Sequence, residues 1–196
     1  MKWFRRSPLA GARWVVIDCE TSGLDTARDR LLSVAGVKVR GGGIELQDYF
    51  DSRVRQEAPS APDNILVHGI GADAQRSGQP LAQVIEGLDA FMGADLPVAF
   101  HAPFDAAILR RHGLARRAKW LDLAALAPAL FPGRKAEVLD DWLAAFGIPA
   151  HGRHDALGDA FASAQLLLVV LGEARRQRVA SVEALREAAT SRFLRP

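Results

Sequence analysis

Three strand-like segments follow one another near the N-terminus, before any helical pattern begins. Trp14 to Asp18 is a short apolar run with several β-branched residues, which predicts a buried strand. Leu31 to Val39 is also strand-like, although its alternation is less clean. Gly41 to Gly43 predicts a turn into a third strand from Ile44 to Phe50. Strands joined by such short connections indicate an antiparallel meander.

Strand and helix patterns alternate along the remainder of the chain. Residues 51–63 hold charges and two prolines and predict a loop. The elements expected after it are a helix from Leu81 to Met92, a strand from Leu96 to Phe100, a helix from Phe104 to His112, a short strand at Trp120 and Leu121, helices from Asp122 to Leu130, Glu137 to Phe146 and Ala156 to Leu171, and a last helix from Ser181 to Thr190 with Ser181 as N-cap. This order predicts an α/β fold with a mixed sheet flanked by helices, and such sheets bind ligands at the carboxyl ends of their strands.

The size and composition predict one soluble domain. A chain of 196 residues can bury a full core, and 49% hydrophobic with 24% charged residues is typical of globular proteins. No apolar run approaches the roughly 20 residues that span a bilayer. The basic N-terminus lacks the apolar segment of a secretory signal, and the single cysteine, Cys19, cannot form an internal disulfide. We therefore expect a cytoplasmic protein without membrane association.

The net charge gives little indication of a partner. With 25 basic and 23 acidic residues the chain carries +2, which is too near neutral to identify a nucleic-acid-binding protein. Basic residues gather near the start (Arg5, Arg6, Arg13), in the middle (Arg110, Arg111, Arg116, Arg117, Lys119) and near the end (Arg175, Arg176, Arg178). We interpret most of them as solvated helix faces and helix C-termini, while a few could line a path for phosphates.

Two acidic residues, Asp18 and Glu20, stand where the first predicted strand ends. Side chains two apart on a strand point to the same face, so the pair brings two carboxylates together. Like charges side by side are costly near a core unless something neutralises them, and a divalent cation does so. The alternative for either residue is a capping role in the turn at 21–23.

Three further residues are candidates for the same kind of site, and each stands alone in its segment. Asp105 follows the strand that ends at Phe100 and opens a helix, so its alternative role is that of an acidic residue at a helix N-terminus. Asp159 lies near the start of a long apolar helix, where a carboxylate is unusual unless it is paired or bound to a metal. His154 lies five residues earlier, and a histidine in a loop is usually only a surface residue.

Together these residues form an ordered set of motifs. Asp-Cys-Glu-Thr-Ser-Gly-Leu at 18–24, Phe-His-Ala-Pro-Phe-Asp at 100–105 and His-Asp-Ala-Leu-Gly-Asp-Ala at 154–160 each occur in a strand or helix context. The set resembles the three motifs of the DEDDh family of 3′→5′ exonucleases, which includes the proofreading epsilon subunit of bacterial replicative polymerase. Val-His-Gly-Ile at 67–70 resembles a fourth segment of that family, and the resemblance extends from about residue 13 to 171.

The resemblance implies a ribonuclease H-like fold with a mixed five-stranded sheet. It implies that Asp18, Glu20, Asp105 and Asp159 hold two Mg²⁺ or Mn²⁺ ions. His154 then acts as the general base, since histidine titrates near neutrality. His151 competes for this role, and the family spacing of five residues to Asp159 favours His154. Two hard cations about 3.5–4 Å apart suit phosphodiester cleavage because they clamp both oxygens of an in-line displacement.

Other positions match residues that contact the substrate in the family. These are Thr21, Gly23, Leu24, His68, His101 and Phe104. Core packing is the alternative for Leu24 and Phe104, and base stacking at the end of a strand is the functional reading of Phe104. His101 stands where most family members have Asn, so the second motif departs from the family's usual pattern at a position expected to hold the scissile strand. Asp122 and Asp155 are plausible decoys for the acidic set, with Asp122 interpreted as structural, and His112 is interpreted as a helix C-cap.

The sequence thus predicts a 3′→5′ exonuclease that releases nucleoside 5′-monophosphates from single-stranded or frayed DNA. An exonuclease acting on RNA is the alternative, and a nuclease fold that binds without cutting is the rival from another class. We expect an N-terminal extension at 1–12, an exonuclease domain at 13–175 and a peripheral helix with a tail at 176–196. No clear clamp-binding motif is present, so polymerase association stays open, as does a homodimer.

Overall fold

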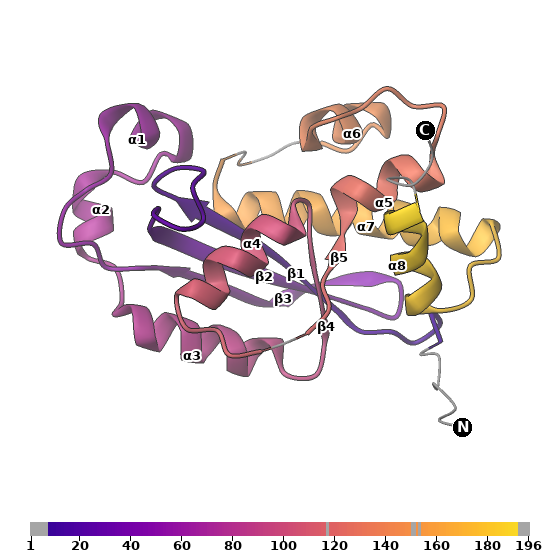
Figure 1. The fold of residues 1–196 in the computed structure, drawn as a ribbon, viewed down its shortest axis with the longest axis horizontal. Coiled ribbons are helices and arrows are strands. Elements are labelled where there is room, and N and C mark those ends of the chain that lie inside the picture. The colour runs from indigo at the N-terminus through magenta and orange to yellow at the C-terminus, as the bar shows by residue number, and fades with distance from the viewer. Residues whose placement is uncertain (1–7, 117, 150–151, 153, 192–196) are drawn as a thin grey trace.

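The computed structural model describes residues 8–116, 118–149, 152 and 154–191, and a five-stranded sheet lies at its middle (Figure 1). The strands are β1 (Trp14–Thr21), β2 (Leu31–Arg40), β3 (Gly43–Arg53), β4 (Leu96–Ala99) and β5 (Leu121–Asp122). The helices are α1 (Pro62–His68), α2 (Ala72–Arg76), α3 (Leu81–Met92), α4 (Ala102–Arg111), α5 (Leu123–Leu130), α6 (Leu139–Ala145), α7 (Ala156–Arg176) and α8 (Val182–Ser191).

The sheet has the strand order β3-β2-β1-β4-β5 and is mixed. β1, β2 and β3 form an antiparallel meander, while β4 pairs parallel with both β1 and β5. The predicted mixed five-stranded sheet flanked by helices is therefore confirmed. β2 is buried along its length except at Arg40, because it lies between two strands and is covered on both faces. This position explains why its sequence alternates poorly.

Helices cover both faces of the sheet and define two hydrophobic clusters. α7 crosses one face, and α3 and α4 lie on the other (Figure 1). Trp14 and Val16 of β1 pack in the α7 cluster, whereas Val15 and Ile17 pack in the α3–α4 cluster. Since side chains alternate along a strand, Asp18 continues the series that faces α7.

The two parallel neighbours at the middle of the sheet overlap only briefly. β4 pairs with β1 from Trp14 to Val16, and then β4 ends and the chain turns into α4. β1 continues to Thr21, so its last residues run past the end of β4. This local opening at the carboxyl end of two parallel strands is where an α/β sheet offers room for a ligand.

The structure corrects the expectation of a loop over residues 51–63. β3 continues to Arg53, and α1 begins at Pro62. Neither α1 nor α2 was predicted, because they are seven and five residues long and too short to show an apolar period. Pro62 in the first turn and Gly69 in the left-handed region after the last residue are nevertheless ordinary signals for helix ends.

α7 is longer and more apolar than expected. It continues past Leu171 to Arg176, where Arg176 forms an ion pair with Glu173. By length and composition α7 could cross a membrane, contrary to the expectation that no segment approaches that length. Leu166, Leu167 and Val170 are fully buried within the protein, so the apolar residues of α7 form the core of this fold.

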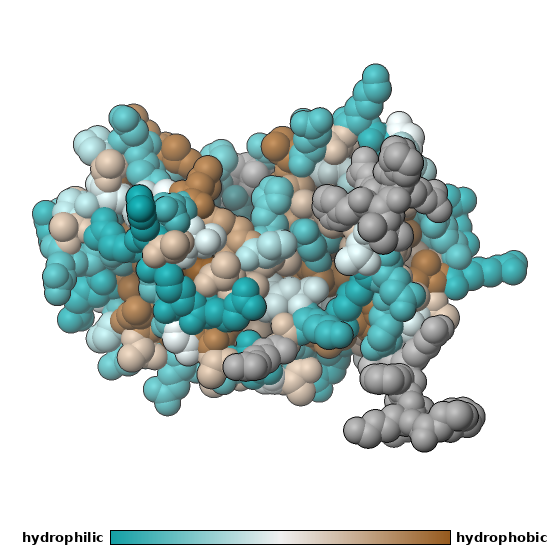
Figure 2. Space-filling view, viewed as in Figure 1, coloured by the Kyte–Doolittle hydropathy of each residue, from teal (hydrophilic) through white to brown (hydrophobic). Residues whose placement is uncertain are grey.

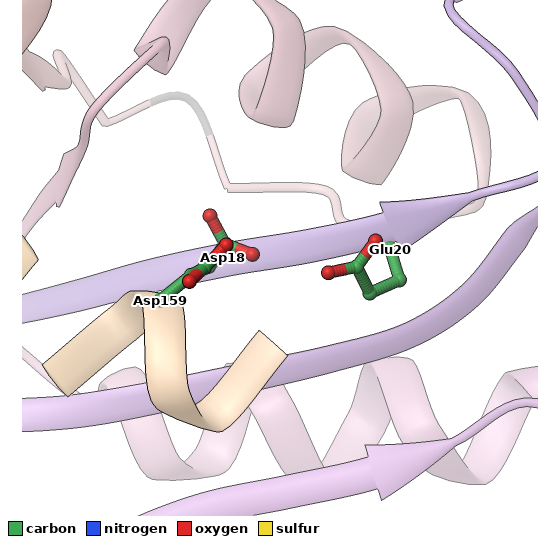
Figure 3. Close-up of side chains that lie close together, drawn as sticks. All are labelled: Asp18, Glu20 and Asp159. Carbon is green, nitrogen blue, oxygen red and sulfur yellow. The ribbon is translucent and has the colours of Figure 1, made fainter. Parts of the chain in front are cut away.

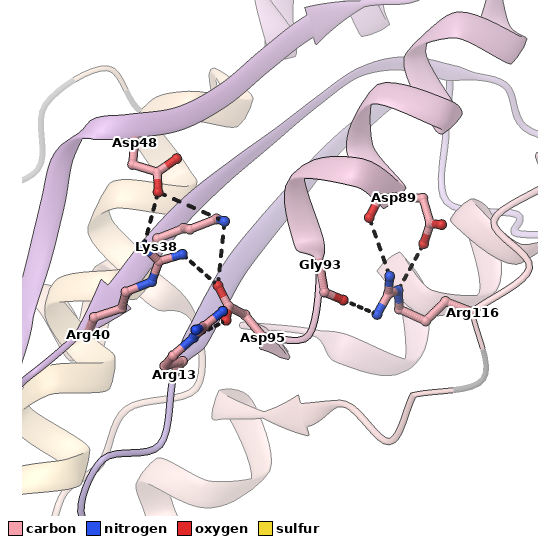
Figure 4. A network of polar contacts seen from close by, with 8 residues as sticks. All are labelled: Arg13, Lys38, Arg40, Asp48, Asp89, Gly93, Asp95 and Arg116. Atoms are coloured by element: carbon pink, nitrogen blue, oxygen red, sulfur yellow. Dashed lines mark hydrogen bonds and ion pairs between the residues drawn. The ribbon is translucent and has the colours of Figure 1, made fainter.

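A buried carboxylate joins the strands at the end of the sheet remote from the opening. Asp95, whose side chain is wholly buried, accepts from Arg13 Nε at 2.6 Å and Arg40 Nη2 at 3.1 Å, with Lys38 Nζ at 3.5 Å (Figure 4). Burial alone would raise the pKa of Asp95, but the hydrogen bonds from Arg13 and Arg40 outweigh it and lower the pKa. Nearby, Arg116 donates to Asp89 Oδ1 at 2.9 Å and to the Gly93 carbonyl.

The described ends of the chain pack together on the domain. Leu9 N–H donates to the Ala180 carbonyl at 3.0 Å, and Leu9 is buried in the α7 cluster. On α8, Val182, Leu185 and Ala189 are buried in the same cluster, and Ser181 caps the helix as predicted. The proposed boundaries at residues 12 and 175 stay a prediction, and both flanking segments contribute to the core.

Candidate active site

Three carboxylates converge where β1 runs past β4. Ligand atoms of Asp18, Glu20 and Asp159 all lie within 4.8 Å of one another. Figure 3 shows Asp18 and Glu20 projecting from β1 beside the first turn of α7, which carries Asp159. β1 is longer than predicted, so the two acids lie inside the strand rather than at its end. The strand thereby fixes their common face.

Asp105 reaches the same place from the opposite face of the sheet. It lies in the first turn of α4, is 5% exposed and lines the same cavity as the three carboxylates, without belonging to their close cluster. Burial raises the pKa of Asp105 to about 7, against hydrogen bonds from Cys19 that lower it. Burial and the Asp105 charge likewise raise the pKa of the Cys19 thiol.

The cavity around these residues has a volume of about 680 Å³. Its described lining contains five carboxylates and two histidines, namely Asp18, Glu20, Asp105, Asp122, Asp159, His101 and His154. Within the part of the chain that the structure describes, no lysine or arginine lines it. Clustered carboxylate oxygens are the ligands that hard divalent cations prefer, so the donor set fits Mg²⁺ or Mn²⁺.

His154 lies at the rim of this cavity, just before α7. It is exposed, and its backbone N–H donates to Asp159 Oδ2 at 3.3 Å. Its φ of 61° is in the left-handed region, which is costly for a residue other than glycine and often marks a functional position. His151, the competing residue, lies outside the described residues.

Two further acids cap helices, and for Asp122 this is the structural role that the sequence suggested. Asp155 caps α7 by accepting from Gly158 N–H at 3.3 Å. Asp122 caps α5 by accepting from Ala124 N–H at 3.2 Å. Asp122 also lines the cavity, and burial raises its pKa. It is therefore placed to act on a ligand in addition to capping its helix.

The structure tests the core-packing alternative for Leu24 and Phe104. Leu24 is 88% exposed and lines the cavity, so it does not serve the core. Phe104 packs partly against the α3–α4 cluster, as its core-packing alternative requires, and it also lines the cavity. Its base stacking stays a prediction. His101 is exposed at the start of α4 and lines the cavity as well.

The turn after β1 is built on Asp29. Its carboxylate accepts from Ser22 Oγ at 2.9 Å and from Asp25 N–H at 2.7 Å. A Cβ on Gly23 would lie 2.6 Å from Asp29 Oδ2, so a larger residue there would have to displace the Asp29 carboxylate from these hydrogen bonds. Thr21 is buried, and its hydroxyl donates to the Gly23 carbonyl at 2.6 Å. Neither Thr21 nor Gly23 is among the described residues that line the cavity.

His68 is 4% exposed and lies outside the described lining of the cavity. Its Nδ1 accepts from Ile70 N–H at 2.9 Å, and its Nε2 lies 2.9 Å from Asn64 Oδ1 and 3.2 Å from Ser60 Oγ. Both ring nitrogens are thus engaged within the protein. Burial lowers the pKa of His68, in keeping with a neutral ring. The expected substrate contact of His68 stays a prediction.

The sequence reasoning missed one apolar wall of the cavity. Val138 and Leu139, at the start of α6, line it together with the acids of β1, and Val138 is 54% exposed. The surface is notched along its upper edge between the parts that carry α1 and α6 (Figure 2). An exposed valine at a helix start was the only signal, and the sequence does not distinguish it from any other surface residue.

The RNase_T model, described as an exonuclease family, matches residues 15–167. The chain belongs to the DEDDh (DnaQ-like) exonuclease family. The match spans all three motifs, from the acids of β1 to the first half of α7, so the family resemblance seen in the sequence is confirmed.

Two curated relatives are much longer than the chain. A DNA polymerase III subunit epsilon-like protein of Rhodobacter capsulatus is 31% identical over 172 residues, which are 84% of this chain and 24% of that protein. A PolC-type DNA polymerase III of Bacillus subtilis is 30% identical over 180 residues, which are 89% of this chain and 12% of that protein. The chain therefore spans a quarter or less of these relatives.

Solved exonuclease structures share the fold. Exonuclease X in complex with 5′ overhanging duplex DNA has a TM-score of 0.73 at 23% identity, covering 90% of this chain and 99% of that one. The nuclease domain of 3′hExo, a DEDDh family member bound to rAMP, has a TM-score of 0.70 at 16% identity, covering 83% and 93%. The predicted ribonuclease H-like α/β fold is confirmed.

Proposed function

We propose that this exonuclease removes nucleotides from the 3′ end of single-stranded or frayed DNA with two divalent cations and releases nucleoside 5′-monophosphates. The observation that carries the proposal is the convergence of Asp18, Glu20 and Asp159 within 4.8 Å, with Asp105 in the same cavity. The names of the relatives support DNA as the substrate, since they are a DNA polymerase III subunit epsilon-like protein and a PolC-type DNA polymerase III. A cytoplasmic location is proposed on the same basis.

In this proposal the four acids Asp18, Glu20, Asp105 and Asp159 hold the metals. Bound cations would supply an activated water and relief of charge on the leaving 3′ oxygen. His154 takes the proton of the attacking water at its imidazole, which lies at the solvent-exposed rim and can pass that proton to bulk water. Leu24 and Phe104 pack against the bases at the end of the strand.

RNA is the alternative substrate. The structural likeness to a nuclease domain bound to rAMP supports RNA as a second candidate substrate, because the fold accommodates a ribonucleotide in that protein. Discrimination depends on contacts with the 2′-hydroxyl. Polymerase association and a homodimer are further proposals that purification and light scattering would test.

One digestion experiment tests substrate, polarity and metal together. Single-stranded DNA, frayed duplex DNA and RNA of matched sequence, each labelled at the 5′ end, are incubated with the protein in Mg²⁺ or Mn²⁺. We expect a ladder of products shortened from the 3′ end, 5′-monophosphates as the released nucleotides, and no cleavage in chelator or by Asp18→Ala. Tight binding of the oligonucleotide without cleavage in Mn²⁺ would support the non-cutting alternative instead.

A further inference from the structure

Asn64 and His68 form a hydrogen-bonded chain that leads from inside α1 to the end of β1. His68 Nδ1 accepts from Ile70 N–H, so the proton of the neutral ring is on Nε2. Nε2–H then donates to Asn64 Oδ1 at 2.9 Å. This contact orients the Asn64 amide, whose Nδ2 donates to the Thr21 carbonyl at 3.2 Å. Each group in the chain therefore has one defined donor or acceptor role.

The Thr21 carbonyl lies where β1 has lost its regular partners. The pairing of β1 with β2 is irregular between Glu20 and Thr21, and β4 stopped pairing at Val16. Ser22 N–H donates to the Arg30 carbonyl on the β2 side at 3.0 Å. Because the peptide is trans, the Thr21 carbonyl points the opposite way, to the side that β4 has left. Asn64 supplies the donor that a neighbouring strand would otherwise give.

A buried glutamine, Gln75, anchors the other end of this series of hydrogen bonds. Gln75 is 1% exposed, and its side chain accepts from Ser60 N–H at 2.8 Å and donates to Ser60 Oγ at 3.0 Å and to the Ile70 carbonyl at 2.8 Å. Ser60 and Ile70 are the neighbours of the His68 ring. The network therefore fixes α1 on both sides of His68, inside the protein rather than at the cavity.

We propose that His68 and Asn64 are positioning residues that hold the Glu20–Thr21 end of β1, and with it the Glu20 carboxylate, in place for metal binding. This inference depends on the proposed function for its metal centre. It assigns His68 an indirect role in place of the substrate contact that the motif suggested. Glu20 immediately precedes Thr21, so a shift of the Thr21 peptide moves a member of the carboxylate cluster.

The matched variants follow from the donor and acceptor roles. Asn64→Asp is isosteric and replaces the donor to Thr21 by a carboxylate oxygen. His68→Leu removes both ring contacts, whereas His68→Gln retains an N–H near the Nε2 position and is the conservative rescue. The control is Asp63→Asn, on the exposed side of the same helix. It replaces a carboxylate by an amide, the reverse of Asn64→Asp, one residue away.

Hydrogen exchange of the peptide covering residues 18–24 reports the strand end without any metal or substrate. Asn64→Asp and His68→Leu should raise its deuterium uptake, and the double variant should raise it no further because both act through one chain. His68→Gln and Asp63→Asn should resemble the wild type. Unchanged uptake at 18–24 in both Asn64→Asp and His68→Leu would overturn the proposal.

Calorimetric titration with Mn²⁺ and steady-state kinetics then separate positioning from substrate contact. We expect Mn²⁺ affinity to fall about five- to tenfold in both variants, the size of one lost hydrogen bond, with KM for the oligonucleotide little changed. A raised KM in His68→Leu with unchanged Mn²⁺ affinity would show direct substrate contact and overturn the proposal. If the wild type cuts no substrate while uptake changes as expected, the positioning of the strand end holds and the proposed function fails.

Discussion

Asp18 offers the most direct test of the metal centre at the scale of single residues. Its carboxylate belongs to the close cluster, and Asp18→Asn keeps its shape while removing a charged ligand. With Mn²⁺ at about 100 times its Kd, linkage should stabilise the wild type by about 2.7 kcal/mol, a rise in Tm of roughly 5–10 °C. In Asp18→Asn this rise should fall below about 2 °C, and nuclease activity should fall at least about 100-fold.

The control for Asp18 is Asp73→Asn. Asp73 is an exposed aspartate on α2, and its carboxylate forms a local ion pair with Arg76. The variant makes the same chemical change far from the cluster. It should keep both the Mn²⁺-dependent rise in Tm, measured by thermal unfolding, and the activity. An equal loss of the rise in both variants would mean that Mn²⁺ stabilises the protein elsewhere.

At the scale of elements, His112 joins the end of α4 to the start of β2. Its Nδ1 donates to the Ile108 carbonyl at 2.8 Å and its Nε2 accepts from Leu31 N–H at 3.4 Å, as the C-cap predicted from the sequence. Burial lowers the pKa of His112 below 6.5. The unfolded chain then binds the proton more tightly, so the contribution of His112 to stability is full above pH 6.5 and is lost as pH falls through the lowered pKa.

His112→Gln retains one donor and one acceptor but cannot titrate. Urea unfolding at pH 7.5, 6.5 and 5.5 should show the free energy of unfolding of the wild type falling below pH 6.5, with a smaller fall in the variant. The slope that persists in the variant should come partly from His68, whose pKa burial also lowers. Equal slopes in the two proteins would count against a buried neutral His112.

For the whole molecule, Asp95 connects three strands at the end of the sheet away from the active site. Asp95→Ala leaves three cations without their shared carboxylate, and Arg13 and Arg40 can still reach water, with side chains 56% and 33% exposed. We therefore expect a loss of about 2 kcal/mol, less than for a fully buried pair, and a Tm lower by roughly 4–8 °C. Below the melting range, kcat should stay within about twofold of the wild type. A loss of activity without a loss of stability would contradict this structural role.

The sequence by itself determined the sheet and most of the site. The meander, the alternation that puts Asp18 and Glu20 on one face, and the helix that carries Asp159 follow from periods of two and 3.6 residues, which are local properties of the chain. The family motifs brought Asp105 and His154 into the set, although neither residue is distinctive alone.

The tertiary structure decided what depends on packing between distant segments. The early end of β4 opens the sheet beside Asp18, and Asp105 enters from the other face. α1 was missed because seven residues carry no detectable period, yet it supplies the hydrogen bond to Thr21. Inside the protein, both ring nitrogens of His68 are hydrogen-bonded, to Asn64 and to Ile70, whereas the motif alone suggested a residue open to substrate. Burial and hydrogen-bond partners are set by neighbours far apart in the chain, and no local pattern encodes them.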